Sequence, residues 1–360
     1  MSAGPNKMAL IKELRERTGA PITDVKSVLQ ASNWDLEEAS KELRKKGLAA
    51  ASKKASRRAA EGLASLFSSP SVVSAVEINS ETDFVARNPQ FQELISAAAK
   101  SIVDLHGSSA GSGAGWSTTA TGSLTVPREA ALDAPSGSSS VGASVADLAG
   151  TVRENVSFRR AEVLPVPSDG VVGTYVHASA TPGGPSGRIA AAVALAARGP
   201  AVEAARAADP AALATAVRAS LEPAAQQLAM HVAAAFPRYL RRADVPPEAL
   251  AAERELLTQQ AASSGKPAKI VAKMVEGRLN KFYGDVCLEE QTFVVDDSKR
   301  VRDVAKDAAA DLAKALGAAP KDATVDLEGF VRLQVGEGIE AAEEADFAAE
   351  VEKTIRETSA

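Results

Sequence analysis

The sequence predicts an α+β protein of several domains. Three observations favour this class: strand-like alternation at 72–79, 171–177 and 188–195, helical periodicity in the segments between them, and a Pro/Gly-rich turn at 181–185 that joins two strands into an antiparallel hairpin. Strands interspersed with helices and joined by hairpins are typical of α+β folds rather than of doubly wound sheets. The 360 residues, 45% of them apolar, are enough for two or three domains.

Residues 1–50 are expected to form a small bundle of three helices. Gly and Pro at 18–21 separate the first helical pattern from the second, which Thr23 is expected to cap. Asp35 is expected to cap the third helix and Gly47 to stop it. So small a bundle is marginal by itself, and it is more typical of a docking module than of a site for chemistry.

Residues 51–70 are interpreted as a basic connecting segment. Lys53, Lys54, Arg57 and Arg58 make this part of the chain locally basic, so it either contacts an acidic protein surface or RNA, or is a solvated linker. Aromatic side chains that would stack on bases are absent from the segment's charged run, which favours the solvated linker.

A first core subdomain is expected over 71–165. It opens with the strand at 72–79, whose apolar residues alternate between two faces. The stretch 107–144 is rich in Gly, Ser and Thr and is expected to be a flexible insertion. Order is expected to return with a helix at 145–160 and a strand at 161–166.

The connection at 82–87 lies between this first strand and the helix that follows it. Asn88 is a natural N-cap and the proline after it is a natural first helical residue, so the next helix is expected to begin there. Phe84 in the connection has two interpretations. It either folds back into the core, or, because Asp83 and Arg87 flank it, is presented outward to a partner.

The second core subdomain is expected over 166–245 and 284–338, with a helical hairpin inserted at 246–283 and an acidic helical module at 339–360. The hairpin is expected because two helical patterns flank a Ser/Gly break. The elements expected within the second core subdomain are strands at 171–177 and 188–195, an Ala-rich helix to about residue 240, strands at 293–295 and 329–335, and a helix at 301–316.

The sequence predicts that the chain itself does not bind nucleotide, nucleic acid or a membrane. Gly265 and Lys266 are followed by Pro267 where a P-loop needs Ser or Thr. Lys and Arg total 41 against 46 Asp and Glu, a net charge of −5, which argues against a surface devoted to nucleic acid. No run approaches the roughly 20 apolar residues that cross a bilayer.

No catalytic residue, metal site or cofactor is expected. The three histidines, at 106, 177 and 231, are not paired at helical spacing with another metal ligand. The single cysteine, Cys287, excludes an internal disulfide framework and is expected to be a small buried apolar side chain. A Ser-His-Asp triad can still assemble in space, although no Gly-x-Ser-x-Gly elbow stands in a strand-to-helix context. The scarcity of reaction machinery favours a protein that acts by binding.

Six blocks of the sequence resemble the elongation factor Ts family, and they occur in the family's order. They are LRERTGA at 14–20, ETDFVARN at 81–88, QLAMHVAA at 227–234, SGKP at 264–267, KMVEGR at 273–278 and VGEGIE at 335–340. The blocks NWDLEEA at 33–39 and ASKKASR at 51–57, with the Ser/Gly-rich insertion, look most like the mitochondrial members from plants and green algae. The resemblance therefore implies the mitochondrial matrix, with the chloroplast stroma and the bacterial cytoplasm as alternatives. The first ten residues carry no visible import signal, so it is either not needed or already removed.

The resemblance implies both an architecture and a function. The implied architecture is a ubiquitin-associated-like N-terminal bundle, a two-part α+β core with antiparallel strands, a helical hairpin inserted in the second part and a C-terminal helical module. The implied function is nucleotide exchange without covalent chemistry. The partner would be elongation factor Tu, GDP-bound and nucleotide-free, and GDP release would follow from disturbance of its magnesium and phosphate site.

The resemblance also implies which residues meet the partner. Phe84 matches an apolar wedge that enters a pocket between partner helices, and Asp83 matches an adjacent polar contact that fixes the register. Thr82 and Val85 shape the segment. The other implied contacts are His231 and Ile189 from the second part of the core and Arg15 and Ile22 from the N-terminal bundle.

Two other functions stay open from the sequence. The N-terminal bundle and the basic segment would also suit a ribosome-associated or nascent-chain-binding protein without exchange activity. Such a protein has no reason to carry the 82–85 block, which therefore favours an exchange factor. A hydrolase with a triad assembled in space would be revealed by an active-site probe that labels a serine.

Overall fold

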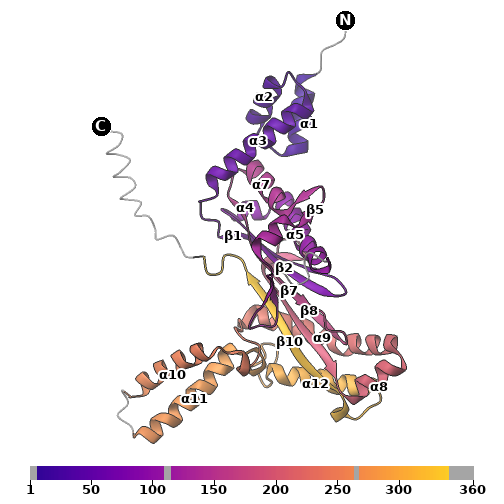
Figure 1. The fold of residues 1–360 in the computed structure, drawn as a ribbon, viewed down its shortest axis with the longest axis vertical. Helices are drawn as coiled ribbons and strands as arrows, with labels where there is room; N and C mark the ends of the chain where they lie inside the picture. Colours follow the sequence, from indigo (N-terminus) through magenta and orange to yellow (C-terminus); the bar gives the residue numbers. More distant parts are fainter. Residues whose placement is uncertain (1–5, 109–114, 263–266, 340–360) are drawn as a thin grey trace.

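The computed structural model describes residues 6–108, 115–262 and 267–339. It is an α+β molecule in which N-terminal helices stand above a curled antiparallel sheet (Figure 1). The expected fold class is confirmed at this level. The acidic module expected at 339–360 lies, apart from its first residue, outside the described residues. None of the helices in the described ranges is long and apolar enough to cross a membrane.

The N-terminal bundle consists of three helices around a small core of their own. Its core side chains include Leu14, Val28 and Leu29, which are fully buried. Asp35 accepts a hydrogen bond from the backbone N–H of Glu38 at 2.8 Å, so its expected capping role is confirmed. The helices are α1 (Lys7–Thr18), α2 (Ile22–Ala31) and α3 (Leu36–Lys54).

Two expectations for this bundle are wrong. Helix α2 begins at Ile22, directly after Pro21, so Thr23 lies inside its first turn rather than at its cap. Helix α3 does not stop at Gly47 but continues to Lys54. The glycine serves a close helix crossing instead: a Cβ on Gly150 of α7 (Val141–Val152) would lie 2.6 Å from the carbonyl carbon of Gly47.

Within the described residues, one antiparallel sheet of eight strands runs through both parts of the core. Its order is β10-β9-β1-β2-β7-β4-β3, and β8 pairs with β9. The paired registers are antiparallel throughout, and the expected hairpin of β8 and β9 is confirmed. The strands are β1 (Glu61–Ser68), β2 (Val72–Ser80), β3 (Ser117–Thr118), β4 (Leu124–Thr125), β7 (Val156–Pro165), β8 (Gly170–Ser179), β9 (Ser186–Arg198) and β10 (Thr324–Gln334), with β5 (Pro135–Ser136) and β6 (Ser139–Ser140) as a separate pair.

Helices cover the sheet in two groups and enclose two cores. Helices α5 (Pro89–Gly107) and α7 pack on β1, β2 and β7 around Phe91, Ile95 and Phe158. Helices α9 (Pro210–Ala235) and α12 (Val301–Ala315) pack on β8, β9 and β10 around Leu221 and Phe330. The remaining helices are α4 (Asp83–Ala86), α6 (Arg128–Asp133), α8 (Pro200–Ala208), α10 (Pro247–Ala262) and α11 (Ala268–Val286).

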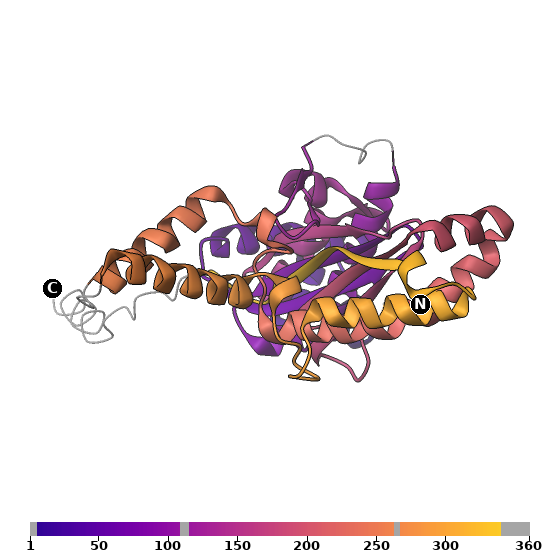
Figure 2. The ribbon, with the colours of Figure 1, turned by 90° about the horizontal axis from the view of Figure 1, so that it is seen from below.

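The expected helical hairpin is confirmed as α10 and α11. The two helices lie side by side and project away from the sheet (Figures 1 and 2). They bury a small core of their own, made of Leu257, Ala261, Val275 and Leu279. The base of the hairpin packs in a second cluster with Tyr239 and Cys287 of the body, so the hairpin is both internally packed and anchored.

Several expected elements differ from the structure. Part of the segment expected as a connection, 51–70, is strand β1, with five consecutive buried residues. Residues 156–160 are strand instead of helix, because α7 ends where Arg153 adopts a left-handed φ of 60°. Residues 293–295 form a turn rather than a strand, and the Ala-rich helix ends at Ala235 instead of near 240.

The sequence predicts a flexible insertion at 107–144, and for residues 115–144 this prediction is wrong. Residues 115–144 carry two short strand pairs and α6, and Val126 and Ala131 are buried in the first core. The polar side chains bond to one another and to the sheet, as when the hydroxyl of Ser123 donates to a carboxylate oxygen of Glu162 at 2.6 Å. Small polar residues here build an ordered layer because their hydrogen bonds are satisfied. Residues 109–114 lie outside the described ranges.

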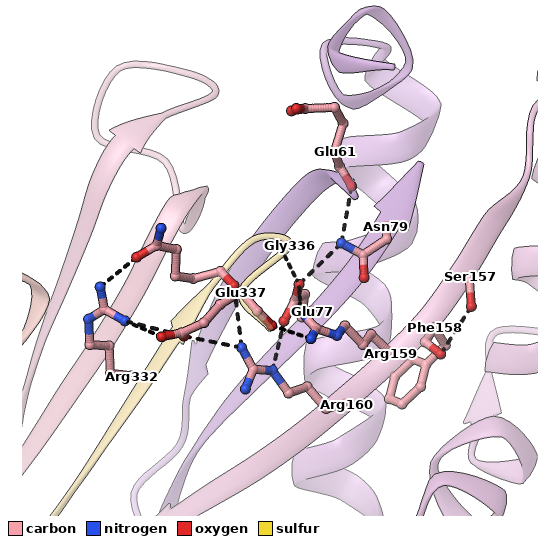
Figure 3. A network of polar contacts seen from close by, with 11 residues as sticks. Glu61, Glu77, Asn79, Ser157, Phe158, Arg159, Arg160, Arg332, Gly336 and Glu337 are labelled. Atoms are coloured by element: carbon pink, nitrogen blue, oxygen red, sulfur yellow. Dashed lines mark hydrogen bonds and ion pairs between the residues drawn. The ribbon is translucent and has the colours of Figure 1, made fainter. Parts of the chain in front are cut away.

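A buried carboxylate joins β2, β7 and the turn after β10 (Figure 3). The side chain of Glu77 is 0% exposed, and its oxygens lie 2.8 Å from Nη1 of Arg159 and 2.7 Å from Nε of Arg160. Its Oε1 also accepts from Nδ2 of Asn79 and from the backbone N–H of Gly336. The β2–β7 register shifts beside Glu77, and this bulge lets two consecutive arginines reach the same carboxylate.

Candidate binding site around Phe84

Phe84 projects from the surface on the one-turn helix α4, which connects β2 with α5. Its side chain is 76% exposed, whereas the neighbouring Val85 and Ala86 are 7% and 5% exposed and pack into the first core. The Phe84 ring therefore points outward instead of folding back into the core. An exposed phenyl ring on a turn whose next two residues are buried is available to a partner at little cost in conformational entropy.

The segment before Phe84 is held by hydrogen bonds from both sides. Glu154, between α7 and β7, accepts from the backbone N–H of Thr82 at 3.0 Å and from its hydroxyl at 2.8 Å. The hydroxyl of Ser80 donates to the carbonyl of Thr82 at 2.9 Å. The carboxylate of Glu81 accepts from the backbone N–H of Asn155 at 2.6 Å. These bonds fix the direction in which α4 leaves the sheet.

Asp83 lies beside Phe84 on the rim of this surface. One of its carboxylate oxygens pairs with Nη2 of Arg87 at 2.8 Å, an i,i+4 contact between two exposed side chains. The helix after this segment begins as expected, because the side chain of Asn88 accepts from the backbone N–H of Gln90 at 2.9 Å. The sequence signals around Phe84 therefore place it correctly between two elements.

His231 is buried in the free chain, and its contact with a partner stays a prediction. On α9 it is 0% exposed, its Nδ1 accepts from the backbone N–H of Val294 at 3.2 Å, and its Nε2 lies 3.0 Å from Oε1 of Gln291. The amide nitrogen of Gln291 donates to two backbone carbonyls, so its oxygen accepts the Nε2 proton. A neutral His231 thus supports the turn in which Val294 and Val295 are about half exposed.

The pH dependence of stability should report the burial of His231. Burial lowers its pKa, so on acidification the unfolded chain takes up a proton at His231 before the folded chain does. The contribution of neutral His231 to the free energy of unfolding is therefore fully present above the unfolded pKa of about 6.5, and it is lost as the pH falls below that value. Urea unfolding measures the free energy of unfolding at pH 7.5 and at pH 5.5. The decrease between the two pH values should be smaller for His231→Gln than for the parent chain.

The exposed histidine on β8 provides the control for this measurement. His177→Gln should keep the parent's loss of stability between the two pH values, because its ring is exposed in the folded chain. An equal loss in the parent and in His231→Gln would contradict the assignment of the pH effect to His231.

The remaining residues expected at the partner interface come from elements other than α4. Ile189 on β9 is half-buried and packs against the second core. Arg15 on α1 and Ile22 at the start of α2 are exposed on the N-terminal bundle. The expected contacts therefore come from three parts of the fold, which are the bundle, the α4 turn and the second core.

The described residues contain no group of three or more His, Cys, Asp and Glu side chains that could hold a metal ion. Cys287 is fully buried as expected, and burial raises the pKa of its thiol to about 11. A thiol in this state is a packing group rather than a nucleophile. What the site offers is an anchored apolar side chain at the surface, which suits it to binding another protein.

Comparison with known proteins points to one family. The family model described as "Elongation factor TS" matches residues 81–337, well over half of the chain. The chain is 42% identical to the elongation factor Ts of Rhodospirillum rubrum over 348 residues, 97% of this chain and 98% of that protein. It is 41% identical to that of Rhodospirillum centenum and 42% identical to that of Paramagnetospirillum magneticum. Each of these two alignments covers 95% of this chain and 95% or more of the relative.

Proposed function

The chain belongs to the elongation factor Ts family, and we propose that it drives nucleotide exchange on elongation factor Tu through the anchored turn that carries Phe84. It is a translation elongation factor of the exchange type and acts by binding. The observation that carries the proposal is the contrast between a 76% exposed Phe84 and the buried Val85 that follows it. This contrast supports a wedge held ready before the partner arrives.

The proposed mechanism requires no reacting side chain. In a P-loop GTPase, GDP is held by backbone amides, a lysine and a magnesium ion, so it leaves slowly because all of these interactions must break together. A factor that binds the loosened state better than the GDP-bound state shifts the partner toward GDP release. By linkage, the factor weakens GDP binding by the same ratio as GDP weakens binding of the factor. GTP in excess then displaces the factor.

An exchange assay tests the function directly. Elongation factor Tu loaded with fluorescent GDP is mixed with an excess of unlabelled GDP, with and without the chain. We expect the chain to accelerate loss of the label in proportion to its concentration until the partner is saturated. Binding without acceleration would support a ribosome-associated or nascent-chain-binding protein instead.

Asp83 should contribute less to exchange than Phe84. Its carboxylate is half exposed and already paired with Arg87, so a contact from it to a partner is a rim contact in water. We expect Asp83→Ala to lower the exchange rate by about 3- to 10-fold, the equivalent of about 1 kcal/mol. The same fluorescent GDP assay measures it, and a loss equal to that of Phe84→Ala would contradict the distinction between rim and anchor.

The subtype and compartment are a further part of the proposal. We propose that the N-terminal bundle is ubiquitin-associated-like and that the chain works in the mitochondrial matrix. Support comes from the blocks at 33–39 and 51–57, which resemble the plant and green-algal members. The relatives found by comparison are bacterial, which corresponds to the alternative of the bacterial cytoplasm. Fluorescent tagging in the source cell decides between the compartments.

A further inference from the structure

Glu154 makes an unusual pair of contacts with the segment that carries Phe84. Its two carboxylate oxygens accept from a single residue, Oε2 from the backbone N–H of Thr82 at 3.0 Å and Oε1 from the hydroxyl at 2.8 Å. The two residues are 72 positions apart in the sequence. The contact therefore joins the start of α4 to the junction of α7 and β7.

The side chain of Thr82 makes this contact instead of capping α4. Thr82 stands at the N-cap position of α4 with an extended backbone, where a threonine side chain commonly accepts from the helix's own N–H groups. Here the hydroxyl donates to Glu154 instead of capping α4. A helix of four residues has little stability of its own, so its direction depends on the groups that hold its two ends.

The residue after Glu154 extends the same support to the N-terminal part of the chain. The backbone N–H of Asn155 donates to Glu81 at 2.6 Å, and its side-chain amide donates to the carbonyls of Ala55 and Arg57, at 3.3 and 2.6 Å. These carbonyls belong to the chain between α3 and β1. The Phe84 turn and the connection from the N-terminal bundle are thus tied to one point of the sheet.

We propose that Glu154 is a positioning residue for nucleotide exchange, which acts by fixing Thr82 and thereby presenting the Phe84 ring in its binding orientation. The inference rests on the proposed role of Phe84. With Glu154 in place, the partner meets an ordered turn. Without its two hydrogen bonds to Thr82, binding must also order the segment, which lowers the affinity for the loosened partner.

A glutamine at this position tests the proposal with little change in volume. Glu154→Gln keeps one oxygen that accepts from the backbone N–H of Thr82, while its NH₂ group donates to the Thr82 hydroxyl, so both bonds lose the carboxylate charge that strengthens them. We expect the exchange rate to fall about tenfold. The matched control is Glu162→Gln on β7, where a half-buried carboxylate accepts from the hydroxyl of Ser123 rather than from Thr82. It should change the rate by less than about twofold.

A double-mutant cycle separates positioning from a general structural role. Exchange is measured for the parent, Glu154→Gln, Phe84→Ala and the double variant. If Glu154 acts through the ring, the double variant exchanges at the rate of Phe84→Ala, because no ring is left to position. Hydrogen exchange of the Thr82 amide in the free chain should accelerate in Glu154→Gln and stay unchanged in Glu162→Gln.

The outcomes are distinguishable from failure of the proposed function. A parental rate in Phe84→Ala overturns the role of Phe84 and the positioning with it. A slow Phe84→Ala with a parental Glu154→Gln overturns the positioning alone, as does a double variant in which the two losses multiply. If Glu154→Gln fails to fold, Thr82→Val replaces it in the cycle, because it removes the hydroxyl donor and keeps the N–H, and the same criteria apply.

Discussion

Phe84→Ala is expected to lower the rate of GDP release from elongation factor Tu by about 30-fold or more, while the free energy of unfolding stays within about 0.5 kcal/mol of the parent. The exchange loss corresponds to a buried interface anchor, whose truncation typically costs about 2 kcal/mol or more. The fold is spared because the ring is 76% exposed and its removal leaves no cavity in the core. Fluorescent GDP release and urea unfolding measure the two quantities on the same preparation.

A second exposed phenylalanine provides the matched control. Phe67, near the end of β1, is 36% exposed and lies outside the expected partner contacts. We expect Phe67→Ala to change the exchange rate by less than about twofold, whatever it does to stability. Equal losses in the two variants, or a parental rate in Phe84→Ala, would show that the exposed ring is not the anchor.

The local signals around this site were readable in the sequence because they act over a few residues. An N-cap at Asn88 and a strand predicted to end at Asn79 confine Phe84 to a short connection, and the structure has the cap and a strand that ends one residue later. The direction of the ring could not be predicted in the same way. It depends on the burial of Val85 in a core built from α5, β2 and β7. The residues next to Val85 in the sequence carry no signal for this burial.

Support that comes from distant residues left no sequence signal. Glu154 reaches Thr82 across 72 positions, and nothing in the spacing of acidic residues marks the pair. The hydrogen-bond partners of His231 could not be predicted for the same reason, because Gln291 and Val294 lie on a turn after the inserted hairpin. The resemblance singled out His231, but only the packing shows that it is buried and supports that turn.

The missed elements have two different physical causes, burial on both faces and polar composition. Strand β1 has five consecutive buried residues, so it lacks the alternation by which a half-buried strand is recognised. The layer at 115–144 was hidden by composition, since Ser, Thr and Gly suit both loops and satisfied hydrogen-bond networks.

Glu77→Ala is expected to destabilise the chain by about 3–5 kcal/mol, the largest stability effect that we predict for a single polar side chain. Glu77 is fully buried and neutralises two arginines, Arg159 and Arg160, whose side chains are only a quarter to a third exposed. Its removal leaves Arg159 without a carboxylate partner, leaves Arg160 with only Glu337 at 3.6 Å, and leaves the N–H of Gly336 without its acceptor.

The control is another carboxylate of the same hairpin. Glu61 pairs with Arg188 at the surface, and both side chains are well exposed, so Glu61→Ala should cost less than about 1 kcal/mol. Urea unfolding compares the two variants, and hydrogen exchange at Gly336 shows whether the turn after β10 is released first. If Glu77→Ala were no more costly than Glu61→Ala, the Glu77 cluster would be an incidental ion pair. A large difference would show that the Glu77 cluster holds β2, β7 and the end of β10 together. Strand β2 is the strand that leads into the Phe84 turn.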